Sequence, residues 1–72
     1  MADLELLSVV ALTENLPAKG LLRGQMGTIV EKLAPGIYEV EFRDDAGKTC
    51  AMVPVAAALL MQLHHEPKHF AA

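Results

Sequence analysis

Residues 23–42 read RGQMGTIVEKLAPGIYEVEF and are the most informative part of the chain for its fold class. Its two halves are rich in β-branched and aromatic residues, and a short Pro-Gly connection at residues 34–36 separates them, which is typical of a β-hairpin. In the second half Tyr38, Val40 and Phe42 alternate with charged residues. Period-two alternation predicts a strand with one buried face and one solvated face. The stretch therefore predicts a β-sheet.

Turn signals on both sides of this hairpin divide the rest of the chain. Residues 14–24 contain an asparagine, a proline and two glycines, which favour a long loop, and residues 44–47 read DDAG, a typical β-turn. Pro54 is expected to end the fourth strand because proline has no N–H for the ladder, and residues 55–58 then form a single helical turn. The predicted strands are residues 8–13, 25–33, 37–43, 48–53 and 59–63.

These elements predict an all-β fold: a small five-stranded SH3-like barrel with a short helical turn before the last strand. No segment has the helical periodicity, over about 10–15 residues, that an α/β crossover needs. A chain of 72 residues makes one domain. Residues 1–7 are predicted to form an N-terminal lead-in, residues 8–63 the barrel, and residues 64–72 a flexible C-terminal tail.

The chain is unusually apolar for its size. Hydrophobic residues make up 53% of it, with only three aromatic side chains, and the mean hydropathy is +0.32. A small barrel cannot bury so much aliphatic surface, so the surplus predicts an oligomer interface or a partner-binding patch. Residues 53–61 carry no charge, and part of them is expected at such an interface. Leu60 and Met61 should point to opposite faces of the last strand, and the chain is predicted to form a homo-oligomer.

The sequence predicts a cytoplasmic protein that does not enter a membrane. Its N-terminus is acidic, whereas a secretory signal begins with basic residues. The longest uncharged stretch, residues 49–63, is interrupted by Pro54 and is shorter than the roughly 20 residues that span a bilayer. Cys50 is the one cysteine, so an intramolecular disulfide is excluded, and we expect a reduced, half-buried structural thiol.

The charge of the chain disfavours nucleic acid as a partner. The net charge is −3 and the pI is about 5.4, whereas nucleic-acid affinity comes largely from neutralising phosphates. Lys19 and Arg23 lie on either side of two leucines, and cations beside aliphatic side chains suit a protein partner. The predicted partner surface consists of Lys19, Leu21, Leu22, Arg23, Leu59, Leu60 and Met61.

The acidic and histidine residues offer weak chemistry. Glu31, Glu39 and Glu41, with Asp44 and Asp45 nearby, could form a catalytic carboxylate pair or a cation site, and Glu39 and Glu41 share one face of a strand. A solvated outer face does not raise a carboxyl pKa as a general acid requires, so a solvated face is favoured. The alternative is an acidic surface that a basic partner recognises.

His64, His65 and His69 lie in the predicted tail, where ordering the chain opposes metal binding. The sequence therefore predicts no catalytic residue, no metal site and no cofactor, and it predicts that the protein is not an enzyme.

Gly24 and Gly27 allow two interpretations. The first is a backbone that approaches a ligand closely, as in an RNA contact, and the second is a tight bend at the start of a strand, where a neighbouring strand packs close. The spacing does not fit a phosphate-binding loop, and no helix follows. The structural interpretation is favoured.

Several motifs together resemble a known family. Residues 21–31 and 38–42, with residues 9–17, 45–49 and 59–63, fit the pattern of a small bacterial family filed only as a domain of unknown function, number 4926 of that series. The resemblance covers about residues 6–63 and implies a free-standing SH3-like barrel without an established activity. The glycine-containing core is also similar to KOW modules of ribosome- and transcription-associated proteins, and to small barrel subunits that dock onto redox complexes.

The functional prediction is a non-catalytic protein-interaction module, a small accessory or regulatory protein with a protein partner. The alternative is a KOW-like module that associates with RNA or the ribosome. That alternative requires a contiguous basic stripe with exposed aromatic side chains, and the sequence offers neither.

Overall fold

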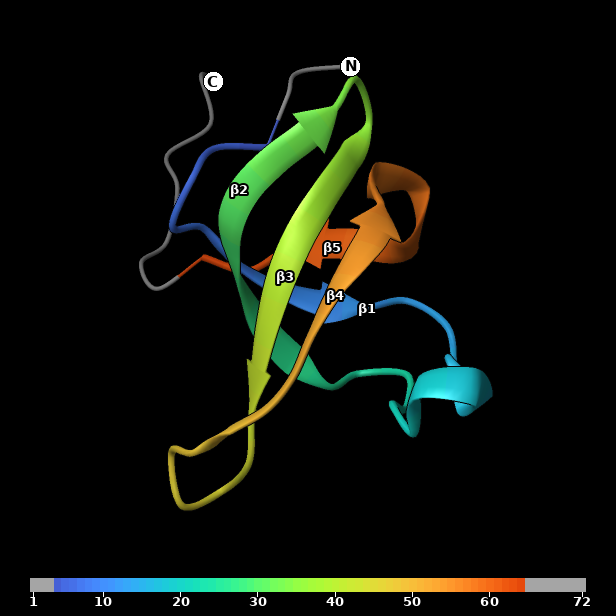
Figure 1. Cartoon of the computed structure of the whole chain (residues 1–72), viewed down its shortest axis with the longest axis vertical. Helices are drawn as coiled ribbons and strands as arrows, with labels where there is room; N and C mark the ends of the chain where they lie inside the picture. Colours follow the sequence, from blue (N-terminus) through green and yellow to red (C-terminus); the bar gives the residue numbers. More distant parts are fainter. Residues whose placement is uncertain (1–3, 65–72) are drawn as a thin grey trace, which may run out of the picture.

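The computed structural model describes residues 4–64 of the chain. Five strands and two short 3-10 turns follow one another along the sequence (Figure 1). The elements are β1 (Val9–Leu12), η1 (Pro17–Lys19), β2 (Met26–Ala34), β3 (Ile37–Arg43), β4 (Thr49–Ala56), η2 (Ala57–Leu59) and β5 (Leu60–Gln62). All strand pairs are antiparallel, which confirms the predicted all-β class with five strands.

The strands form one bent sheet in the order β4-β3-β2-β1-β5. The nine-residue strand β2 lies at the centre of the sheet and connects the pair β3 and β4 to the pair β1 and β5. Its start pairs with β1, and nearly its whole length pairs with β3. Two register shifts, between Ile29 and Glu31 and between Lys32 and Ala34, accompany the curve of β2 that Figure 1 shows. Within the described residues β4 and β5 remain the two edges of an open sheet, so the closed barrel is not confirmed.

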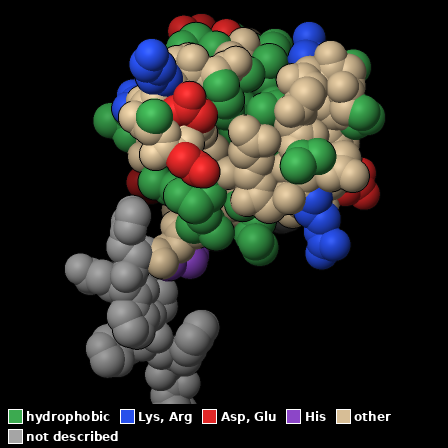
Figure 2. Space-filling model, turned by 90° about the horizontal axis from the view of Figure 1, so that it is seen from below, with side chains coloured by type: hydrophobic (Ala, Val, Ile, Leu, Met, Phe, Trp, Pro, Cys, Tyr) green, Lys and Arg blue, Asp and Glu red, His purple; other side chains and the backbone are tan. Residues whose placement is uncertain are grey.

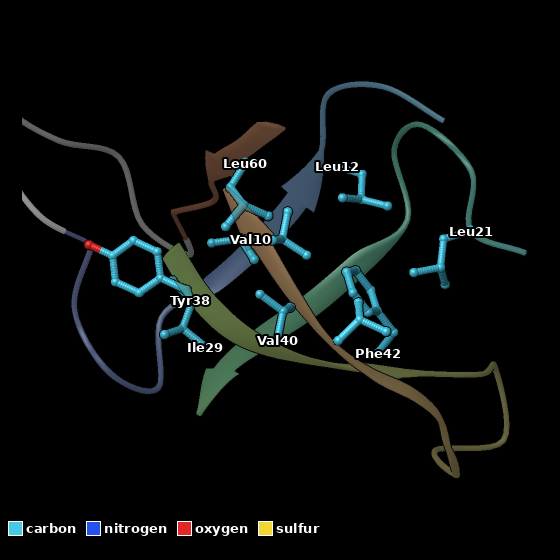
Figure 3. Close-up of a cluster of buried hydrophobic side chains, with 10 residues drawn as sticks. Val10, Leu12, Leu21, Ile29, Tyr38, Val40, Phe42 and Leu60 are labelled. Atoms are coloured by element: carbon cyan, nitrogen blue, oxygen red, sulfur yellow. The ribbon is translucent and has the colours of Figure 1, made fainter. Parts of the chain in front are cut away.

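The core lies on the concave inner face of this sheet (Figure 3). As the alternation in β3 predicts, Tyr38, Val40 and Phe42 are only 1%, 0% and 0% exposed. Figure 3 shows Tyr38 at one end of the core and Leu21 at the other. The Tyr38 hydroxyl accepts a hydrogen bond from the backbone N–H of Leu4 at 3.1 Å, which ties the lead-in segment to the core. The other buried core side chains are Val10, Leu12, Ile29, Val53, Val55 and Leu60.

The predicted end of β4 at Pro54 is wrong. The strand continues to Ala56, and Pro54 pairs with Glu39 of β3. β4 is an edge strand, and proline is tolerated there when its nitrogen faces away from the paired neighbour. Because β4 is longer than predicted, the turn η2 begins at residue 57 rather than 55, and β5 is confined to residues 60–62.

The uncharged stretch at residues 53–61 contributes to the core more than predicted. Val53, Val55 and Leu60 are buried, so much of this stretch is covered by the chain itself. Met61 is 53% exposed and Leu60 is 9% exposed, which confirms that the two point to opposite faces of β5. The homo-oligomer stays a prediction, with Met61 as the exposed apolar residue of this stretch.

Candidate functional site

The two faces of the sheet differ in composition. One row of directly paired residues, Val10, Gly27, Phe42 and Ala51, crosses β1 to β4 on the inner face. The neighbouring row, Val9, Thr28, Glu41 and Met52, crosses the same strands on the opposite side, which we call the outer face. The outer face therefore mixes apolar and polar side chains.

A groove of about 640 Å³ opens on this outer face, between the end of the loop before β2 and the turn after β3. Its floor comes from the middle of the sheet, and its two walls come from segments that are about 20 residues apart in the sequence. The lining residues are Val9, Gly24, Gln25, Met26, Gly27, Thr28, Glu41, Arg43, Asp44 and Asp45.

The floor carries a hydrogen-bonded polar cluster. Glu41 Oε1 accepts hydrogen bonds from Arg43 Nη2 at 3.0 Å and Arg43 Nε at 3.2 Å, and Glu41 Oε2 accepts one from the Thr49 hydroxyl at 2.7 Å. These donors, Thr49 first and then Arg43, hold the pKa of Glu41 below its ordinary value because they stabilise the carboxylate. Glu41 is thus ionised and already paired, which does not suit a general acid or base.

The β3–β4 turn forms the acidic wall. Asp44 Oδ1 accepts the backbone N–H of Ala46 at 2.9 Å and that of Lys48 at 3.0 Å, so this carboxylate organises the turn as the sequence predicts. The next residue, Asp45, is exposed, and its carboxylate has no hydrogen-bond or ion-pair partner among residues 4–64. Asp45 therefore offers the groove a negative charge that the fold itself does not use.

The other wall is the end of the long loop before β2. Gly24 has a φ of +87°, a region that favours glycine, and its N–H donates to Leu12 O at 2.7 Å. Gln25 anchors the residues just before it, because its Oε1 accepts the N–H of Leu22 at 3.2 Å, and its Nε2 donates to Cys50 Sγ at 3.8 Å. These contacts tie the end of the loop to β1, to β4 and to its own backbone.

Gly27 has a structural role, which agrees with the favoured interpretation. A Cβ at this position would lie 2.7 Å from Val40 Cγ1, 2.9 Å from Phe42 Cδ1 and 3.0 Å from Glu41 O. Only a residue without a side chain lets β2 approach β3 this closely above the core.

Three methionines lie exposed along the outer face. Met26 pairs with Ala11, which in turn pairs with Met61, and Met52 belongs to the row that contains Glu41. Their side chains are 57%, 53% and 51% exposed, for Met26, Met61 and Met52. Figure 2, a view from below, shows hydrophobic side chains interspersed with acidic and basic ones on this side of the molecule. The groove lining itself combines apolar Val9 and Met26 with four charged residues.

The predicted partner surface is only partly exposed. Lys19, Leu22 and Arg23 are exposed on the loop, and Leu22 is 66% exposed. Leu21, however, is 2% exposed and belongs to the core, because Leu16 and Leu21 pair in a bridge that turns Leu21 inward. Its prediction as a surface residue is wrong.

The second half of that predicted surface needs the same correction. Leu60 is a core residue and Leu59 is half-buried against the core, so Met61 alone is fully available there. The structure does not bring Lys19 or Arg23 into the groove. Sequence patterns do not indicate the groove, because its lining residues converge only through strand pairing, and no local pattern joins residues 9, 24–28, 41 and 43–45.

Two further predictions about side-chain surroundings change. Cys50 is exposed rather than half-buried, because it lies at the irregular start of β4 where the β3–β4 register shifts. Glu39 and Glu41 are half-buried, and Glu39 Oε1 is a buried oxygen without a hydrogen-bond partner among the described residues, so this face is less solvated than predicted. His65 and His69 lie outside the described residues.

Residues 4–64 contain no group of three or more His, Cys, Asp or Glu side chains that could hold a metal ion. In the same part of the chain no helix is long and apolar enough to cross a membrane.

The fold and the groove define a small antiparallel β-domain with an open surface site. The chain belongs to the family described as Domain of unknown function (DUF4926), whose model matches residues 6–62, and the resemblance seen in the sequence is thereby confirmed. No curated protein and no solved structure matches the chain.

Proposed function

We propose that this protein is a non-catalytic protein-interaction module, a small accessory or regulatory protein, which docks a protein partner in the groove of its outer face. The observation that carries this proposal is the groove itself, which places exposed Met26 and half-buried Val9 beside carboxylates on a sheet. A mixture of apolar contact area and charge at its edge is the composition of protein-binding surfaces.

The methionines support this proposal. Methionine is unbranched and polarisable, so it adapts its shape to a partner and is frequent at protein-binding surfaces. Met26, Met52 and Met61 are each more than half exposed, although burial would stabilise them. Contiguous exposed apolar surface marks interaction sites, and Met26 supplies such surface in the groove itself.

The scaffold supports it as well. The floor of the groove consists of strand residues, and hydrogen bonds to Asp44 and Gln25 fix its two walls, so partner binding would order few groups. The order of elements, namely a strand, a long loop, a three-strand meander, a 3-10 turn and a last strand, agrees with an SH3-like module.

The nucleic-acid alternative gains no support from the groove. Its lining carries three carboxylates against one arginine, and Glu41 already pairs with that arginine. A phosphate backbone would meet net negative charge there. We therefore propose a protein partner and a non-enzymatic role, and do not propose RNA binding.

Photocrosslinking in the host cell tests this function. With p-benzoylphenylalanine in place of Met26, we expect one discrete crosslinked product with a protein. The matched position is Leu33, which is 43% exposed on β2 but does not line the groove, and it should give no such product. The same products from both positions, or none from Met26, would contradict the proposal.

A further inference from the structure

We infer that the occupant of the groove is a basic segment of a different protein, in which a Lys or Arg side chain lies next to an aliphatic residue. This inference rests on the proposed function and names the chemistry of the partner.

The charges of the groove lining favour a cationic partner. Four charged residues line the groove, and Arg43 and Glu41 neutralise each other through their 3.0 Å ion pair. Asp44 and Asp45 remain, so the groove keeps two negative charges that no cation of its lining offsets. A partner with positive charge at this place is favoured, and one with negative charge is repelled.

The Asp45 carboxylate can accept a hydrogen bond from a partner. Asp44 uses Oδ1 to hold the turn, whereas Asp45 has no partner among residues 4–64. An ammonium or guanidinium group can therefore form a charge-assisted hydrogen bond with Asp45 without breaking a contact of the fold.

Apolar surface lies in the same groove as the Asp45 carboxylate. Val9 and Met26 line the same groove as Asp45. Lys and Arg side chains bury their methylene stems on apolar surface while the charged end reaches a polar group. The groove thus fits both the methylene chain and the charged group of one Lys or Arg side chain. Met26 can also contact an aliphatic residue next to it in the partner.

The groove has room for a short segment. Gly24 lines it, and a Cβ at this position would meet no atom within 4 Å. The volume of about 640 Å³ lies within the range of about 300–1,000 Å³ that is typical of ligand sites. A short extended segment has room there, and its backbone can approach the sheet.

A random heptapeptide library displayed on phage and selected against the full chain tests the inference. We expect enriched sequences to carry Lys or Arg beside Leu, Ile, Val or Met. A synthetic peptide of the enriched sequence should bind about fivefold more weakly to Asp45→Asn, as expected for losing one partly exposed charge pair. Glu14→Gln removes one carboxylate from the exposed loop outside the groove and should leave the binding unchanged.

The other outcomes separate the two proposals. Enriched peptides that are neutral or acidic, and that lose binding in Met26→Ala, would leave the interaction function standing and overturn the basic segment. A library without any enriched peptide would overturn both. Residues 19–23 of this chain are themselves basic and aliphatic, so self-association that Asp45→Asn abolishes in sedimentation would assign the groove to a second copy and overturn the different protein as its occupant.

Discussion

The two faces of β3 show what the chain uses for folding and what it leaves for binding. On the inner face Tyr38, Val40 and Phe42 are at most 1% exposed, so their side chains offer no surface to a partner. On the outer face Glu41 and Arg43 pair with each other in a groove whose neighbouring methionines remain exposed. Since adjacent residues of one strand point to opposite faces, a single strand supplies both the core and the candidate site.

The largest effect is expected on the inner face. Phe42→Ala removes a fully buried ring and leaves a cavity, so unfolding in urea, followed by far-UV circular dichroism, should show a loss of about 3–5 kcal/mol. Met52→Ala, one strand away on the outer face, should change stability by no more than about 0.5 kcal/mol. Equal losses in the two variants would erase the distinction between the faces.

Gly27→Ala tests the close approach of β2 and β3 above the core. The added methyl group would meet Val40 Cγ1 at 2.7 Å and Glu41 O at 3.0 Å, and the backbone atom cannot move aside as a side chain can. We expect a loss of about 1–3 kcal/mol in the same unfolding experiment, as for overpacking. Thr28→Ala, the next residue on the outer face, is the control and should cost clearly less. A silent Gly27→Ala would mean that the strands are not so close.

Glu41→Gln should have a smaller effect, and its pH dependence identifies the cause. Hydrogen bonds from Thr49 and Arg43 lower the pKa of Glu41 in the folded protein. A lowered folded pKa contributes stability that is present above the unfolded pKa and is lost as the pH falls through the folded pKa. The variant should therefore be less stable than the wild type at pH 7, and the difference should vanish at strongly acidic pH. A difference that persists in acid would assign the effect to packing.

Met61→Asp should leave the unfolding free energy within about 0.5 kcal/mol, because Met61 is exposed in the single chain. The sequence predicts a homo-oligomer, and sedimentation equilibrium should then show an assembly in the wild type and a monomer in Met61→Asp. Leu33→Asp, at another exposed apolar position, is the control. A wild type that sediments as a monomer at high micromolar concentration contradicts the predicted assembly.

Local sequence patterns predicted the bounds of the strands better than they predicted which residues are buried or which strand lies at an edge. The bounds of β3 are confirmed at residues 37–43, because alternation is a property of consecutive residues. The effect of Pro54 depends on whether β4 is an edge strand, and only the order of strands in the sheet decides that, so the sequence pattern does not reveal that the strand continues. Leu21 is buried through a bridge between two positions of a loop, which no local pattern in the sequence indicates.

The candidate site could not be predicted from local sequence patterns for a related reason. Its residues run from Val9 to Asp45, and only the register of β1, β2 and β3 brings them to one groove. The exposed leucine and cations of the long loop were a stronger signal in the sequence, yet the structure does not place them in that groove.

A map of amide chemical shifts shows directly whether the partner binds in the outer-face groove. The chain labelled with ¹⁵N is titrated with the enriched basic peptide, and the amide signals are followed. We expect the largest shifts for the amide signals of four groove residues, Gly24, Gly27, Thr28 and Asp45. The amide signals of Lys19 and Leu22 on the exposed loop should change little. Shifts that gather on residues 19–23 and leave the groove unmoved would contradict binding in the groove.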